Sequence, residues 1–153
     1  VDVSKDILKM AVVERHKNTR HIGIGYLKGY GLKSGAVATS VAHDSHNIIC
    51  VGTNDEDMAF AVNRIARNRG GIVVVENGQV LAELPLEIAG IISGKPLREV
   101  NTLLEDAKKA AHALGVGTDI DPFMTLSFMS LPVIPTLRLT TRGVVDVNTQ
   151  QYV

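Results

Sequence analysis

The chain has little cysteine, few aromatic residues and no net charge, and each shortage excludes a class of protein. Its 153 residues include one cysteine, so no internal disulfide framework can form, which fits a reducing cytoplasm. Tryptophan is missing and aromatic residues make up 4% of the chain, so Val, Ile, Leu and Ala must fill the core. Sixteen Lys and Arg residues balance sixteen Asp and Glu residues. Nucleic-acid grooves and membrane-surface modules need surplus positive charge, so neither is expected.

The chain also has no long apolar run. Its longest uncharged stretch, residues 122–137, is interrupted by three prolines, whereas a membrane-spanning helix needs about 20 apolar residues. No signal peptide is visible, and the chain opens with Val1 rather than Met, so we expect a processed or excised piece of something longer. Apolar residues at 45% and charged residues at 21% are typical of a folded domain.

Short apolar runs separated by Gly, Asn and Asp predict a series of strands. The expected strands are residues 9–15, 22–28, 36–42, 48–52, 72–76, 79–84, 133–140 and 144–147. Asn77-Gly78 lies between two β-rich runs and is a strong hairpin signal. Glycines between residues 23 and 35 fit neither the dinucleotide fingerprint nor the Walker loop, so we expect them to allow tight turns or close strand packing.

Two segments have apolar residues at helical spacing. The first is expected to begin at Thr53, where Thr-x-x-Glu forms a capping box with Glu56, and to stop at Gly70. The second runs from near Pro96 to Gly115.

The second helix is predicted to bury a narrow stripe and to carry a Glu105–Lys109 pair on its solvent face. The stripe consists of Leu97, Val100, Leu104, Ala107, Ala111 and Leu114. Residues 123–131 suit a buried helix or a strand, and periodicity does not decide between them. Together these elements predict one mixed α+β (α/β) domain over residues 1–153, with helices covering a largely antiparallel sheet.

The densest polar cluster in an apolar region is the sequence His43, Asp44, Ser45, His46 and Asn47. On a strand its two histidines would face opposite ways, so they converge only in a turn. Such residues can satisfy turn backbone groups, contact a ligand or move protons, or bind a metal. The residues alone favour the turn interpretation first. Metal binding comes last, because no third ligand is placed by spacing.

The remaining polar and thiol groups have simpler interpretations. His16, His21 and His112 are isolated in sequence and are expected to be solvated or structural. Cys50 lies inside an apolar run and is expected to be a buried small hydrophobe.

Five blocks of the sequence, in order along the chain, resemble the C-terminal domain of adenine deaminase. They are AVVERHK at 11–17, KGYGLKSG at 28–35, SVAHDSHNI at 40–48, VGTNDEDM at 51–58 and DPFMTLSF at 121–128. The resemblance extends over essentially the whole chain.

The resemblance implies that the chain is one domain of an amidohydrolase-superfamily enzyme that hydrolyses adenine to hypoxanthine and ammonia. In that family, manganese or iron in a preceding barrel domain activates the attacking water. The barrel's ligands begin with a His-x-His pair, whereas the nearest pair here is His43-x-x-His46. The zinc deaminase signature is also missing, since it needs several cysteines. No metal ligand is therefore carried onto this chain, no cofactor is expected in it, and the isolated chain is expected to be inactive.

In the parent enzyme we expect the loop from His43 to Asn47 to face the barrel mouth and to touch or close over the substrate. The expected partners are the barrel domain, adenine and further copies of the same chain. Two alternatives stay open: a free-standing purine-binding module, and a structural or oligomerisation module without catalysis. A standalone metalloenzyme that uses His43 and His46 ranks last.

Overall fold

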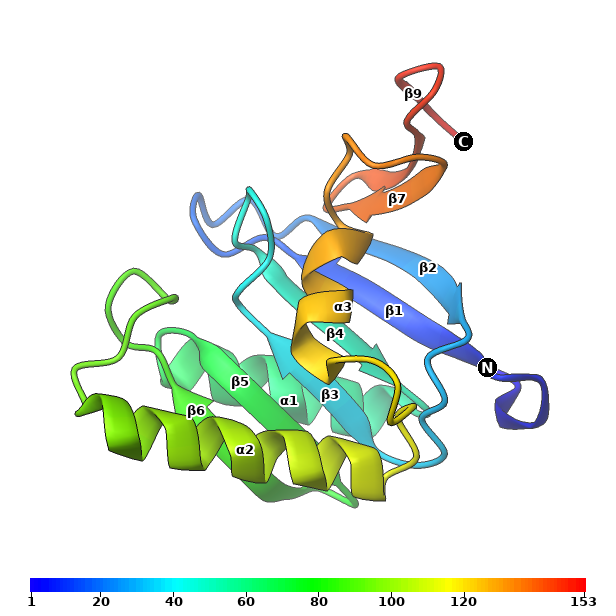
Figure 1. Cartoon of the computed structure of the whole chain (residues 1–153). Coiled ribbons are helices and arrows are strands. Elements are labelled where there is room, and N and C mark those ends of the chain that lie inside the picture. Colours follow the sequence, from blue (N-terminus) through cyan, green and yellow to red (C-terminus); the bar gives the residue numbers. More distant parts are fainter.

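A six-stranded antiparallel sheet organises the chain, and a computed structural model describes it over residues 1–153 (Figure 1). The sheet strands are β1 (Ile7–Val13), β2 (Ile22–Lys28), β3 (Ala36–Thr39), β4 (Ile48–Gly52), β5 (Gly71–Glu76) and β6 (Gln79–Pro85). The helices are α1 (Asp55–Arg67), α2 (Leu97–Ala113) and α3 (Pro122–Met129), after a short 3-10 turn at Val3–Lys5. A second sheet contains β7 (Leu137–Thr140), β8 (Gly143–Asp146) and β9 (Gln151–Tyr152). The α+β prediction with a largely antiparallel sheet is confirmed.

The large sheet consists of three hairpins placed edge to edge, in the strand order β2-β1-β4-β3-β5-β6. The predicted hairpin at Asn77-Gly78 joins β5 to β6. Val13 is paired with Ile22 on one side and with Ile48 on the other. The β1–β2 connection and the β3–β4 loop therefore lie at the same end of the sheet.

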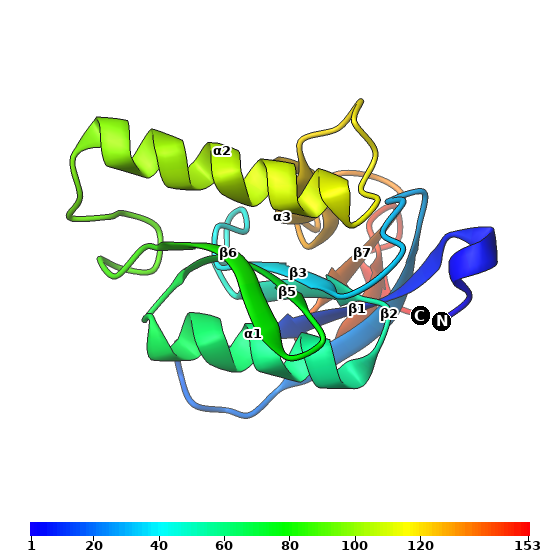
Figure 2. The same cartoon turned by 90° about the horizontal axis from the view of Figure 1, so that it is seen from below.

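Helices cover both faces of the large sheet: α1 lies on one face, and α2 and α3 lie on the other (Figure 2). Because side chains alternate along a strand, β4 supplies both cores and is buried throughout. Ile49 and Val51 join the larger core under α2 and α3, whereas Ile48 and Cys50 join the core under α1. Cys50 is fully buried, as predicted, and burial raises the pKa of its thiol.

The predicted start of α1 is wrong by one residue. Asn54, not Thr53, is the N-cap, and its side-chain oxygen accepts a hydrogen bond from the Asp57 backbone N–H at 2.8 Å. Thr53 instead bonds backward, because its backbone N–H and hydroxyl both donate to the Gly35 carbonyl. Asn is at least as good a cap as Thr, so sequence chemistry alone does not separate the two positions.

Asp57, in the first turn of α1, locks the helix to the β5–β6 hairpin. Its buried carboxylate accepts hydrogen bonds from the Gly78 backbone N–H at 2.8 Å, the Asn77 backbone N–H at 3.2 Å and the Asn54 amide at 3.0 Å. Burial of the carboxyl opposes its ionisation, but these hydrogen bonds together lower the pKa of Asp57.

The α2 stripe and ion pair differ from the prediction. Leu97 is 85% exposed, so the buried stripe begins one turn later, and Pro96 occupies the N-cap position. Glu105 is paired with Lys108 at 3.5 Å rather than with Lys109. Lys108 also reaches Asp121 at 3.0 Å, which ties α2 to the N-cap of α3.

Residues 122–129 are the helix α3, which settles the choice left open between helix and strand. Two predicted strands are shorter than expected. β3 ends at Thr39, whose hydroxyl accepts a hydrogen bond from the Val41 backbone N–H and turns the chain. β7 begins only at Leu137, after two prolines that lack the N–H a ladder needs.

The glycines of β2 allow the second sheet to pack directly against this strand. A Cβ at Gly23 would lie 1.8 Å from the Thr140 carbonyl oxygen, and a Cβ at Gly25 would lie 3.4 Å from the Leu139 side chain. The prediction that these glycines permit close strand packing is confirmed. No helix of the chain is long and apolar enough to cross a membrane.

Candidate functional site

Three connections meet at one end of the large sheet. They are residues 14–21 after β1, residues 40–47 after β3 and residues 86–96 after β6 (Figure 1). Antiparallel pairing requires this arrangement, because β1, β3 and β6 all run toward the same end. The predicted polar residues His43 to Asn47 therefore lie among side chains from two other connections. We call these three connections the loop cluster.

Arg15 joins the three connections of the loop cluster. Its Nε donates to the His46 carbonyl, and its Nη2 donates to the Ala89 carbonyl at 2.7 Å. Its backbone N–H donates to the Asn47 side-chain oxygen at 3.4 Å. The guanidinium lies directly against Gly90, where a Cβ would be 2.4 Å from Nη2. Partial burial lowers the pKa of Arg15 without removing its charge at neutral pH.

His46 is held in one orientation by its own turn. Its backbone N–H donates to the Ala42 carbonyl at 2.6 Å, and its Nδ1 accepts from the Ala42 backbone N–H at 3.2 Å. An accepting Nδ1 carries no proton, so the neutral ring bears its proton on Nε2. Burial lowers the pKa of His46, and the nearby His43 and Arg15 lower it further. The ring is therefore neutral at physiological pH, with Nε2–H as a donor that no protein group accepts.

His43 lies between His46 and α3. Its ring centroid is 5.9 Å from that of His46 in an edge-to-face arrangement and 5.5 Å from that of Phe128. The side chain is half-buried, and neither ring nitrogen has a hydrogen-bond partner in the protein. Neither ring nitrogen is shut off from solvent, so both stay available to hydrogen-bond a ligand.

The five predicted residues divide into two groups. Ser45 and Asn47 serve the backbone, since the Ser45 hydroxyl accepts from the Asn47 N–H at 3.5 Å and the Asn47 side chain bonds Arg15. His43, Asp44 and His46 keep side-chain atoms available to a ligand. The turn interpretation thus describes part of the loop, and the contact interpretation remains open for the rest.

His16 has a structural role, which is one of the two roles predicted for it. Its Nε2 lies 2.7 Å from the Ser45 carbonyl oxygen, so it braces the predicted loop from the neighbouring connection. His16 and Ser45 lie far apart in sequence, and the pairing of β1 with β4 brings them together. His112 is structural as predicted, with its Nδ1 3.1 Å from the Val116 carbonyl oxygen.

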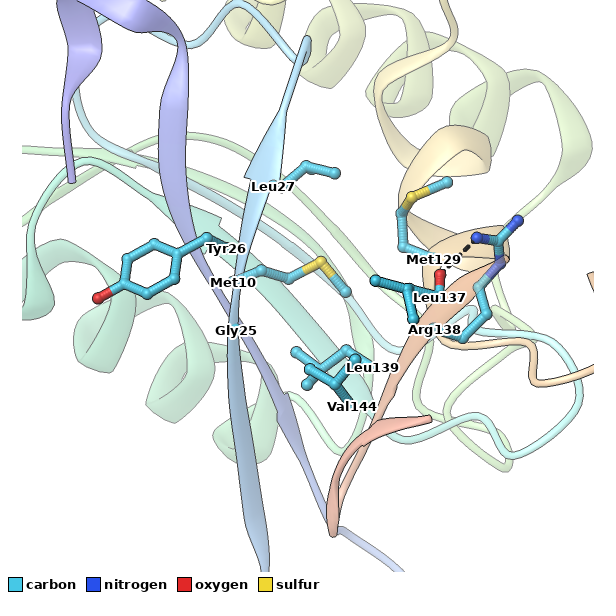
Figure 3. A pocket seen from close by; sticks show the side chains of 9 residues that line it. All are labelled: Met10, Gly25, Tyr26, Leu27, Met129, Leu137, Arg138, Leu139 and Val144. Carbon is cyan, nitrogen blue, oxygen red and sulfur yellow. Dashed lines mark hydrogen bonds between the residues drawn. The ribbon is translucent and has the colours of Figure 1, made fainter. Parts of the chain in front are cut away.

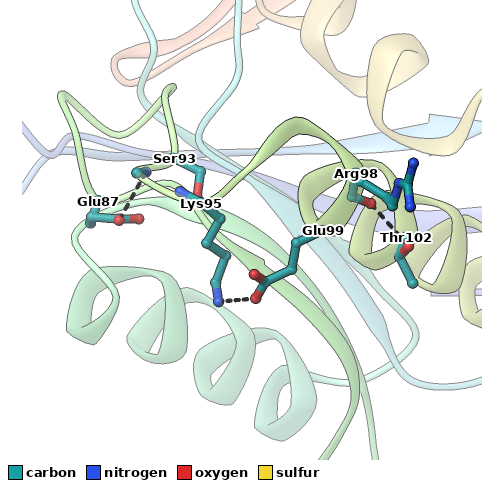
Figure 4. A network of polar contacts seen from close by, with 7 residues as sticks. Glu87, Ser93, Lys95, Arg98, Glu99 and Thr102 are labelled. Atoms are coloured by element: carbon teal, nitrogen blue, oxygen red, sulfur yellow. Dashed lines mark hydrogen bonds and ion pairs between the residues drawn. The ribbon is translucent and has the colours of Figure 1, made fainter.

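Polar contacts hold the third connection, one of them to Ser40 of the second connection and others within it and at the start of α2 (Figure 4). The Gly90 carbonyl accepts from the buried Ser40 hydroxyl, which in turn accepts from the Gly71 N–H at 2.7 Å. Glu87 accepts from the Gly94 N–H at 3.1 Å, and Lys95 is paired with Glu99 at the start of α2. The Ala89 carbonyl that meets Arg15 is thus carried by an ordered segment.

Arg15, Phe128 and the segment at Ala89–Gly90 are site residues that sequence reasoning missed. Arg15 is the last residue of a predicted strand and lies in one of the recognised blocks, and that was the available signal. Arg15, His46 and Ala89 lie far apart in the sequence, and no sequence pattern indicates that they are in contact.

The loop cluster does not form a metal centre. The chain nowhere brings three His, Cys, Asp or Glu side chains into an arrangement that could hold a metal ion. The His43–His46 pair lacks the third and fourth ligands that such a site needs. The groups that the loop cluster offers a ligand are imidazole and carboxylate, which can form hydrogen bonds or move protons.

A second hollow lies between the two sheets, and it is a gap in the packing of mainly apolar side chains. It encloses about 160 Å³ among Met10, Leu27, Met129 and Leu139 (Figure 3). Arg138, at its rim, donates through Nη1 and Nη2 to the carbonyls of Leu137 and Pro135, which leaves its buried Nε as the one unpartnered donor there. The loop cluster remains the candidate site.

Comparison with known proteins gives the family. The model of the adenine deaminase C-terminal domain matches residues 1–151. The adenine deaminase of Nitratidesulfovibrio vulgaris strain Hildenborough is 54% identical over 147 residues, which cover 95% of this chain. Those of Bacillus subtilis and Listeria welshimeri are 47% and 52% identical over 152 residues, or 99% of the chain. In each case the match covers 26% of the relative, so the chain spans about a quarter of their length. The chain therefore belongs to the adenine deaminase C-terminal domain family.

Proposed function

We propose that this chain is the C-terminal domain of an adenine deaminase, which hydrolyses adenine to hypoxanthine and ammonia with one water molecule. The match over residues 1–151 supports the proposal, since relatives of that name extend well beyond the matched region. The catalytic metal-binding barrel is then a preceding domain, where manganese or iron would supply the activated water. The single, buried cysteine is compatible with a cytoplasmic enzyme.

Within that enzyme, we assign the loop cluster to the substrate side of the domain. The observation that carries this assignment is the half-buried His43 ring without a hydrogen-bond partner, beside the outward donor of His46. A purine offers ring nitrogens that accept hydrogen bonds and a flat face on which imidazole can stack. Asp44, exposed at the tip of the loop, can accept a hydrogen bond from an amine. These groups bind and orient a purine or shuttle its protons, and they hold no metal.

The test is kinetic and uses the full-length enzyme. We expect His43→Ala and His46→Ala each to lower kcat/KM for adenine at least about tenfold, the effect of losing one hydrogen bond to substrate. His112→Ala is the matched control, because its ring bonds only the backbone near the end of α2. Circular dichroism and thermal melting check that each variant folds. Unchanged kcat and KM in folded His43 and His46 variants would show that the loop is structural.

The isolated chain of 153 residues is expected to release no ammonia from adenine, even with manganese or iron added. The physical reason is that it contains no group of side chains able to hold the metal. Detectable activity of the pure chain would place the catalytic machinery here instead. An alternative role, a purely structural or oligomerisation module, predicts that loop variants change assembly mass rather than kinetics, and light scattering measures that mass.

A further inference from the structure

The α1 side of β2 is an uncovered apolar surface. α1 packs on β3, β4 and β5 and reaches β6 through the Arg64–Glu83 ion pair, whereas the edge strand β2 lies beyond it. On that side β2 presents Ile22, Ile24 and Tyr26, which are 55%, 57% and 68% exposed. Its glycines face the second sheet, so every large side chain of residues 22–26 points to the open face. Single exposed apolar residues are ordinary, whereas a contiguous row marks an interaction surface.

The β2–α1 groove, which we define as the space between these two elements and β1, makes this surface concave. It encloses about 420 Å³ and is lined mainly by apolar side chains, among them Val13, Ile24 and Val62. Lys9 and Asp55 are its only charged lining residues, and they neutralise each other in an ion pair of 2.6 Å. The groove therefore suits an apolar protein surface rather than a charged ligand.

The groove continues toward the loop cluster. Val13, Val62 and Asn63 also line a neighbouring hollow of about 480 Å³, and Arg15 lies on the wall of that hollow. A protein surface that fills the β2–α1 groove can therefore extend along α1 as far as Arg15. The same surface can contact the apolar row and the loop cluster.

We propose that the catalytic domain of the parent enzyme docks in the β2–α1 groove, with Ile22, Ile24 and Tyr26 as its apolar contacts. This inference rests on the proposed function. About three quarters of each relative lies outside the matched region, and the family is a C-terminal domain, so that sequence precedes this one. The first residues lead directly into the groove, since Asp2 bridges to Ile7 at the start of β1 and Lys9, two residues further on, lines the groove (Figure 1).

Thiol accessibility in the full-length enzyme tests the docking surface. Ile24→Cys places a thiol in the groove, and Leu81→Cys is the matched control on the opposite edge strand, where Leu81 is 46% exposed. Cys50 is fully buried and contributes little labelling in the native state, and the unsubstituted enzyme supplies the background. For each variant, the measurement is the maleimide labelling rate of native enzyme relative to the same enzyme unfolded in urea.

We expect the Ile24→Cys thiol to be protected at least about tenfold more than the Leu81→Cys thiol, because only a docked surface requires opening before it reacts. Equal protection at the two positions would overturn the proposal. The other occupant, a second copy, is detected with Ile24→Lys. If protection is accompanied by a fall in assembly mass for Ile24→Lys in light scattering, the groove is an interface between copies and the proposal is wrong. An unchanged mass supports it.

Labelling does not measure catalysis, so the two proposals fail separately. Unchanged kinetics of the His43 and His46 variants would reject the substrate role of the loop, whatever the labelling rates. An accessible Ile24→Cys thiol would reject the docking surface, whatever the kinetics.

Discussion

Removing the Arg15 side chain should loosen three connections at once. Arg15 makes two charge-assisted hydrogen bonds from its guanidinium, to the carbonyls of His46 and Ala89. Because the group is only partly buried, each is worth about 1.5 kcal/mol, the low end for bonds that involve a charge. Folding of the Ala variant no longer has to order the arginine side chain, which offsets the loss by about 1 kcal/mol of rotamer entropy. The net expectation for Arg15→Ala is a loss of about 2 kcal/mol in the free energy of unfolding.

Urea unfolding of the 153-residue chain measures this loss. At a slope of about 2 kcal/mol per molar urea, the midpoint should fall by about 1 M. Arg15→Lys keeps a charge but presents a point donor rather than a fork, so it should lose about half as much. Arg142→Ala is the control, because its exposed side chain makes no hydrogen bond and should change stability by less than about 0.5 kcal/mol. An Arg15→Ala midpoint equal to that of Arg142→Ala would refute the reasoning.

Two further predictions concern the fold. Gly23→Ala places a Cβ 1.8 Å from the Thr140 carbonyl oxygen and should lower the free energy of unfolding, measured in urea, by about 3 kcal/mol. Gly25→Ala places a Cβ 3.4 Å from the Leu139 side chain and should cost less than about 1 kcal/mol. Equal costs would contradict the packing of the second sheet. Because the pKa of Asp57 is lowered in the folded state, its stabilisation is present above its ordinary pKa of 3.8 and is lost as the pH falls through the folded value. Asp57→Asn should therefore be less stable at neutral pH and lose less stability below about pH 4 in acid titrations, and a wild-type acid slope in this variant would reject that assignment.

Local sequence chemistry predicted most of the elements correctly because most of their signals are local. Asn77-Gly78 supports its hairpin by turn geometry alone, and residues 22–28 form a strand with the predicted bounds. The errors occur where neighbours compete. Asn54 displaces Thr53 as the cap because Thr53 bonds Gly35 across the sheet end, and that contact depends on strand order.

The candidate site was predicted only in part, for the same reason. The polar loop from His43 to Asn47 stands out in sequence, because apolar runs flank it on both sides. Its partners Arg15 and Phe128 come from distant segments, and only the pairing of β1 with β4 and the packing of α3 bring them to it. Periodicity specifies which face of a strand is buried, but it does not specify which strand ends will meet.

The edge-to-edge order of the three hairpins also has a kinetic consequence. Within each hairpin the paired strands are near neighbours in sequence, so their loops close at little cost in chain entropy. The other two pairings, the seams between hairpins, join strands that are farther apart in sequence: β2 and β3 lie between β1 and β4, and β4 and α1 lie between β3 and β5. Folding is therefore limited by seam formation rather than by hairpin formation. The β1–β4 seam also brings Arg15 to His46, so the loop cluster assembles only after the slower pairing is complete.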